Sequence, residues 1–189
     1  FNSPSAIYQH GLEKDDRQVA EWYNTLSGSY DELYGEEQSR KCETVLGLLG
    51  NRHFEVLIDV GCGTGSFLEK AGAIYDYAIG IDLSANMLRI ATKRKTANTD
   101  YVLASSSSLP LKSASSDCTV SISTAKAGSN LSSFIADLKR ISRENSLVAF
   151  TLFQQPGLPN PDPLAKPVHS TIISDRETLY FLRPADSLE

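Results

Sequence analysis

The sequence predicts an α/β protein with a doubly wound, mainly parallel sheet. A short apolar run at 56–58 leads into a glycine-rich turn and then a helical pattern. Further apolar runs alternate with amphipathic segments as far as residue 153. This alternation is typical of βαβ units, which build parallel sheets. A length of 189 residues fits one domain with a single core.

The elements before and within the predicted sheet follow from hydrophobic spacing. Helical patterns cover 13–28 and 36–49, with Tyr30–Gly35 between them, and form an N-terminal helical cap over residues 1–52. The cofactor-binding core spans 53–153. Its strands are expected at 56–58, 77–81, 100–104, 118–123 and 146–153, and its later helices at 84–93 and 131–143, with Ser84 and Asn130 as N-caps.

The last part of the chain, 154–189, combines a proline-rich loop with a hairpin. Five prolines between residues 154 and 167 exclude a helix interior and predict a surface loop. Beyond it, 169–174 and 178–182 are β-rich and are separated by Asp175-Arg176-Glu177, which predicts a C-terminal antiparallel hairpin.

The composition of the chain argues against several classes of function. Eighteen basic and 23 acidic residues give a net charge of -5, the wrong sign for holding a nucleic-acid backbone by charge alone. No apolar run is long enough to span a bilayer and no secretory signal is visible, so a cytoplasmic location without membrane contact is expected. The three cysteines form no C-x-x-C pair, which argues against a disulfide framework or a zinc site, and no metal is expected. The basic residues Arg89, Lys93, Arg94 and Lys95 are interpreted as a solvated helix face.

The turn Asp59-Val60-Gly61-Cys62-Gly63-Thr64-Gly65 is the strongest functional signal. Its glycines permit positive φ and close approach of a ligand to the backbone. Asp59 ends the strand, where it can accept a hydrogen bond from an ammonium group but would repel a pyrophosphate. The dinucleotide fingerprint requires a glycine where this chain has Ser66. Asp82, 23 positions after Asp59, can accept hydrogen bonds from two ribose hydroxyls, which suits NAD as well.

The segment VLIDVGCGTG resembles the first motif of the class I S-adenosylmethionine (SAM) dependent methyltransferases, and 79–88 is similar to the second. Segments 104–111 and 116–121 resemble the third, and the type 11, UbiE-like group fits best. The resemblance implies a sheet of the seven-stranded, Rossmann-like type. It also implies an enzyme with SAM as cofactor and S-adenosylhomocysteine (SAH) as product. It implies that Asp59 orients the methionine amino group, Asp82 the ribose, and residues 105–107 the adenine. The implied cofactor-binding residues are Asp59, Gly61, Cys62, Gly63, Gly65, Asp82, Leu83, Met87, Ser105, Ser106, Ser107, Ser121 and Tyr30.

The sequence resembles the family less closely in the segments expected near the methyl acceptor. Lys126 and Ala127 stand where many relatives have a histidine pair, and the helix-end segment 140–146 lacks the family's turn glycines. His10, His53 and His169 are scattered, so no catalytic base is predicted, and Cys62 is interpreted as a small filler. The predicted function is methyl transfer to an unidentified small molecule, tRNA base substituent or protein. The alternatives are a catalytically weak or inactive SAM-fold binding or partner subunit and, ranked far lower, an NAD-linked oxidoreductase. Oligomeric state and any helper subunit stay open.

Overall fold

The computed structural model describes residues 15–94, 96, 98–126, 131–153, 168–174 and 177–183, and of Lys126 only the backbone. The helices are α1 (Asp16–Leu26), η2 (Ser27–Ser29, a 3-10 turn), α2 (Tyr30–Leu49), α3 (Ser66–Lys70), α4 (Ala85–Ala91) and α5 (Leu131–Ile141). The strands are β1 (Phe54–Val60), β2 (Tyr75–Asp82), β3 (Thr99–Leu103), β4 (Ser116–Lys126), β5 (Ser142–Phe153), β6 (His169–Ser174) and β7 (Glu177–Leu182).

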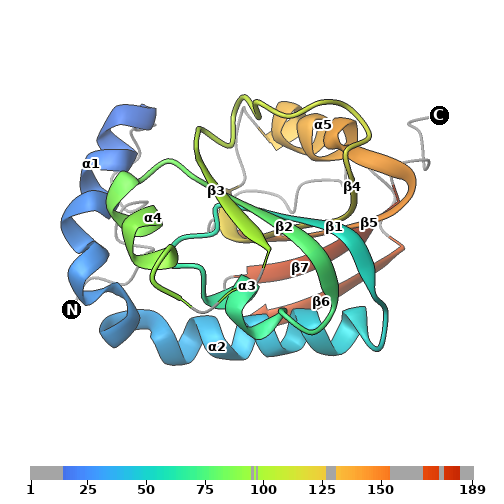
Figure 1. Ribbon diagram of the computed structural model, residues 1–189, viewed down its shortest axis with the longest axis horizontal. Coiled ribbons are helices and arrows are strands. Elements are labelled where there is room, and N and C mark those ends of the chain that lie inside the picture. Colours follow the sequence, from blue (N-terminus) through green and yellow to red (C-terminus); the bar gives the residue numbers. More distant parts are fainter. Residues whose placement is uncertain are drawn as a thin grey trace.

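The strands form one seven-stranded sheet in the order β3-β2-β1-β4-β5-β7-β6 (Figure 1). The first five are parallel, whereas β7 runs antiparallel to both β5 and β6. The chain moves outward from β1 to β3 and then returns to β4 beside β1. Ligands of open α/β sheets bind at such a reversal, outside the carboxyl ends of the strands.

Helices cover both faces of the sheet. In Figure 1, α2 runs along one side of the sheet and α5 lies on the opposite side. Side chains of α2 and α3, among them Val45, Leu49 and Leu68, pack with Leu57 and Val120 in one apolar cluster. Side chains of α5 pack with the alternate strand residues in a second cluster. This alternation is what a sheet covered on both faces requires.

The fold predicted from the sequence is confirmed, including the parallel core, the antiparallel C-terminal hairpin and the Ser84 cap, whose hydroxyl accepts a hydrogen bond from the Met87 amide at 3.2 Å. Two local expectations are wrong. Tyr30–Gly35 is not a connection but the start of α2, because the helical break falls earlier, at Ser27–Ser29. In addition, the helix expected at 131–143 ends at Ile141, and the strand expected at 146–153 begins at Ser142. The helix α5 therefore passes directly into β5 without a turn.

Some expectations lie outside the described residues: the proline-rich loop, the Asn130 cap, and Asp175 and Arg176 of the hairpin turn. The division into cap, core and C-terminal part stays a prediction. Within the described chain, no helix combines the length and the apolar character needed to cross a bilayer.

Candidate cofactor site

The glycine turn after β1 has the conformation that the sequence predicts. Gly61, Gly63 and Gly65 have φ values of 78°, 53° and 79°, in the left-handed region. The amides of Gly61 and Cys62 both donate to the Ile81 carbonyl, at 2.7 and 2.9 Å, which ties the turn to the end of β2. The turn therefore lies at the carboxyl edge of the sheet, with its backbone held from one side.

Asp59 is the most unusual group of the site. Its side chain is buried, with 2% of the residue exposed, and its Oδ2 accepts no hydrogen bond from any described residue. Burial, and secondarily the nearby Asp82 charge, raise the pKa of Asp59 to about 8. A buried carboxylate oxygen without a donor is costly, so this position calls for a ligand that brings a positive donor.

Asp82 receives two backbone hydrogen bonds. Its Oδ2 accepts from the Gly63 amide and its Oδ1 from the Ser84 amide, each at 2.8 Å. Burial raises the pKa of Asp82, and these backbone donors partly oppose that effect. Asp82 thus links the glycine turn to the first turn of α4 and keeps its carboxylate between them.

The other predicted site residues differ in burial and in hydrogen bonding. Leu83 is half-buried, whereas Met87 is 1% exposed and lies in the core behind it. Ser105 and Ser107 bond each other, with Oγ atoms 2.7 Å apart, and the Ser105 hydroxyl also accepts from the Ser107 amide. Ser121 is buried and donates its hydroxyl to the Val60 carbonyl at 2.7 Å, which indicates a supporting contact behind the turn.

Cys62 is buried within the turn, and a Cβ added to Gly80 would lie 2.9 Å from its sulfur. Burial, together with the charges of Asp59 and Asp82, raises the pKa of the Cys62 thiol well above its usual range. A thiol in this state is a poor nucleophile, in agreement with its interpretation as a small filler.

The N-terminal helices close one side of the site. On α1, the Asn24 side-chain oxygen accepts from the Ser84 hydroxyl at 2.7 Å and from the Asn86 amide at 3.1 Å. Tyr30 begins α2 and stands in a row of rings, 6.3 Å from Tyr23 and 5.2 Å from Tyr34 between centroids. The cap is thus bonded directly to the N-terminus of α4, next to Leu83.

Arg94 corrects the interpretation of the basic residues after α4. Arg89 and Lys93 are exposed, as a solvated face predicts, but the Arg94 side chain is only 21% exposed. Its guanidinium donates to the Thr64 carbonyl at 2.5 Å, to Asp31 of α2 at 2.6 Å and to Glu69 of α3. Arg94 therefore joins the glycine turn to two helices, a contact that no local sequence pattern indicates.

Replacing Arg94 with Met is expected to destabilise the fold by about 2 kcal/mol, because it removes two partly exposed ion pairs and a hydrogen bond to a turn carbonyl. Amide hydrogen exchange at Thr64 and Gly65 should also become faster. Arg89→Met is the matched control, since Arg89 makes one exposed hydrogen bond to Asn86, and it should change stability by less than about 0.5 kcal/mol. Equal effects of the two substitutions, measured by denaturant unfolding, would contradict the role of Arg94.

Asp117, which belongs to the resemblance, and the two described histidines lie away from the glycine turn. Asp117 is at the amino end of β4, where its two oxygens accept from the Glu55 and Val56 amides at 2.8 Å, so it fixes β1 against β4. His53 also lies at the amino edge, 2.8 Å from Asp76, which raises its pKa. His169 begins β6 opposite Phe181, on the edge strand that β4, β5 and β7 separate from β1.

Three further residues at the carboxyl edge were not among the predicted site residues. Thr124 lies against Gly61, so closely that a Cβ there would be 2.0 Å from the Thr124 Oγ1. Lys41 and Glu177 are buried and paired, although Glu177 was interpreted as part of a turn. For Lys41 a signal existed, since it shares a helical stripe with the buried Val45 and Leu49.

Comparison with known proteins agrees with this geometry. Residues 58–150 match the methyltransferase domain family. An uncharacterized protein of Methanocaldococcus jannaschii, MJ1252, is 32% identical over 152 residues, which cover 80% of this chain and 57% of that protein. The malonyl-[acyl-carrier protein] O-methyltransferase of Pseudescherichia vulneris is 32% identical over 146 residues, covering 76% of this chain and 56% of the relative. The chain thus spans a little over half the length of these two curated relatives.

Among solved structures, magnesium protoporphyrin IX methyltransferase from Synechocystis, with bound SAH, superposes with a TM-score of 0.68. The sequence identity is 13%, and the match covers 89% of this chain and 98% of that chain, so it supports the fold. Together with the glycine turn at the sheet reversal and the two strand-end carboxylates, these matches show that the chain belongs to the class I, Rossmann-like family of SAM-dependent methyltransferases.

Proposed function

We propose that this protein transfers the methyl group of SAM to an oxygen acceptor that is ionised at neutral pH, a carboxylate of a small molecule or of a carrier-bound acyl group. The proposal of SAM as the methyl donor rests on the buried Asp59 Oδ2. This oxygen has no donor among the described residues and lies directly before the glycine turn. The ammonium of a methionine moiety satisfies that oxygen. A dinucleotide pyrophosphate would be repelled by it.

The remaining residues fit the same cofactor. A carboxylate has about four acceptor positions, and the Gly63 and Ser84 amides occupy two of those on Asp82. The remaining acceptor capacity of Asp82 is left for the ribose hydroxyls. Leu83 supplies an apolar surface for adenine, the 105–107 loop supplies polar groups at its edge, and Tyr30 covers the methionine end. Met87 and Ser121 act behind these contacts.

SAM, when bound, supplies an electrophilic methyl group on a sulfonium. The part of this chain in the reaction is to hold the donor and to exclude water, so that an acceptor oxygen is aligned for attack. Asp59 orients the amino group and Asp82 the ribose, which fixes the direction of the methyl group. These contacts supply alignment and no proton transfer.

The acceptor class follows from the positions of the described histidines, neither of which lies beside the glycine turn. His53 directly precedes β1 at the amino edge, and His169 lies on β6, the edge strand that β4, β5 and β7 separate from β1. A carboxylate has no proton to lose at neutral pH, so it needs no general base, whereas an alcohol or a protonated amine does. The malonyl-[acyl-carrier protein] O-methyltransferases among the relatives favour the same acceptor class.

Calorimetry and labelled transfer test the two halves separately. The protein should bind SAH but not NAD, and Asp82→Ala should weaken SAH binding by roughly 10-fold or more, as expected for lost hydrogen bonds to a charged group. Asp100→Ala is the control, because Asp100 is exposed on β3 and bonds Tyr77. Absence of heat with SAH would refute the proposal of SAM as cofactor.

The acceptor class is tested with methyl-labelled SAM. A malonyl thioester should be methylated and its terminal amide should not. Label appearing only in amines or RNA would refute the acceptor class.

A further inference from the structure

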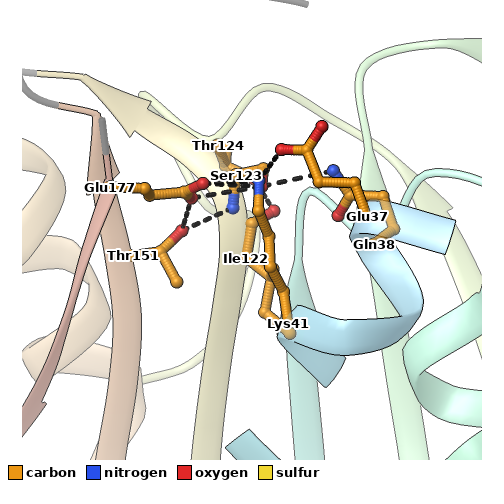
Figure 2. A network of polar contacts seen from close by, with 8 residues as sticks. All are labelled: Glu37, Gln38, Lys41, Ile122, Ser123, Thr124, Thr151 and Glu177. Atoms are coloured by element: carbon orange, nitrogen blue, oxygen red, sulfur yellow. Dashed lines mark hydrogen bonds and ion pairs between the residues drawn. The ribbon is translucent and has the colours of Figure 1, made fainter. Parts of the chain in front are cut away.

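A polar cluster with a buried ion pair at its centre lies at the carboxyl edge, between α2 and β7 (Figure 2). We call it the Lys41 cluster; it consists of Glu37, Gln38, Lys41, Ser123, Thr151 and Glu177. The Lys41 Nζ lies 2.5 Å from Glu177 Oε2, 2.7 Å from Glu37 Oε1 and 3.0 Å from Ser123 Oγ. The Lys41 and Glu177 side chains are 4% and 0% exposed. An ammonium group has three donors, so Lys41 is fully satisfied by its own protein.

The cluster converges on a bulge in β4. The β4–β5 register is regular from Cys118 to Ser121, opposite Leu147 to Phe150, and resumes at Ala125, opposite Leu152. Between these points Ser123 has a φ of +57°, a strained value for a residue with a side chain. Its amide donates to Thr151 Oγ1 at 2.6 Å, and its hydroxyl lies 3.1 Å from Glu177 Oε1.

The bulge also contacts the glycine turn. Thr124 follows Ser123, and its hydroxyl donates to the Val60 carbonyl at 3.2 Å. Its side chain fills the space beside Gly61, where a Cβ would lie 2.0 Å from Oγ1. A continuous series of contacts therefore runs from Lys41 and Glu177 through Ser123 and Thr124 to the turn after Asp59.

We propose that Lys41 and Glu177 are positioning residues for the SAM site, an inference that rests on the proposed function for its ligand. They hold the strained bulge at Ser123, so that Thr124 is kept against the glycine turn. Buried ion pairs are often no more stabilising than apolar pairs of similar size, but they fix one arrangement when every donor and acceptor is satisfied. In this protein the arrangement they fix is that of α2, β4 and β7 around the turn.

The test separates positioning from stability. Glu177→Gln and Lys41→Met should each weaken SAH binding by about 10-fold, measured by calorimetry. The double variant Lys41→Met/Glu177→Leu, which replaces the pair with apolar side chains, should regain thermal stability relative to the single variants but not the lost affinity. In ligand-free protein, amide hydrogen exchange at Gly61 and Cys62 should become faster in all three variants, while exchange in α5 is unchanged.

Thr119→Val is the matched control. Thr119 is buried in a hydroxyl cluster with Ser116 and Ser142, at the opposite, amino ends of β4 and β5. It should lower stability without changing either SAH affinity or exchange at the turn. A double variant that binds SAH like the wild type, or single variants whose turn exchange matches Thr119→Val, would overturn the inference. The exchange result holds even if the wild type fails to bind SAH, an outcome that refutes only the proposed function.

Discussion

Asp59→Asn is expected to stabilise the ligand-free protein at alkaline pH and to weaken its binding of SAH. In the folded protein burial raises the pKa of Asp59 from 3.8 to about 8. The folded state therefore keeps a proton that the unfolded state releases, and stability falls as pH rises between these values at about 1.4 kcal/mol per pH unit. Removing the titratable group removes this loss, so the gain from Asn should be about 2 kcal/mol larger at pH 8 than at pH 6.

The same substitution removes the charge that we propose as the acceptor of the methionine amino group. Hydrogen bonds to charged groups contribute roughly 1.5–3 kcal/mol, so SAH affinity should fall by roughly 10- to 100-fold. Glu55→Gln is the control on the same strand, because Glu55 is 73% exposed and paired with Arg143. Denaturant unfolding at the two pH values and calorimetry provide the measurements. A wild-type pH dependence of stability in the Asn variant, or undiminished SAH affinity, would contradict this account of Asp59.

Gly61→Ala should be the most damaging single change in the turn. Gly61 combines a φ of +78° with the side chain of Thr124, whose Oγ1 would lie 2.0 Å from the new Cβ and whose own Cβ would lie 2.9 Å from it. The backbone strain costs about 1–2 kcal/mol, and the overlap adds about 1–3 kcal/mol. We expect a total loss of about 3 kcal/mol or more and no measurable SAH binding.

Gly63→Ala separates the two contributions. Gly63 also has positive φ, +53°, but nothing lies within 4 Å of an added Cβ. Its replacement should therefore cost only the backbone strain, about 1 kcal/mol. If unfolding experiments give equal losses for the two variants, the close approach of Thr124 to Gly61 does not occur in solution.

The sequence was sufficient where one local pattern carries the information. The apolar run, the glycine spacing and the carboxylates at 59 and 82 predicted the parallel core, the turn and its place at the carboxyl edge. Ser84 was predicted as a cap because a capping hydroxyl acts within one helical turn. Such features depend on neighbours in the chain, and a single sequence contains them.

The sequence was misleading where the partner of a side chain is distant. Arg94 belongs to a basic run, yet its partners Asp31 and Thr64 are 63 and 30 positions away. Glu177 is charged and next to a turn, but it is buried because Lys41 reaches it from α2.

By itself, then, the sequence determined the family, the cofactor class, the backbone conformation of the glycine turn and the position of two carboxylates at strand ends. The tertiary structure decided which polar groups are buried, which are paired and which, like Asp59, lack a partner among the described residues. The physical reason is that hydrogen-bond and ion-pair energies depend on burial and on atoms a few ångströms away. Those atoms come from segments that only the folded chain brings together.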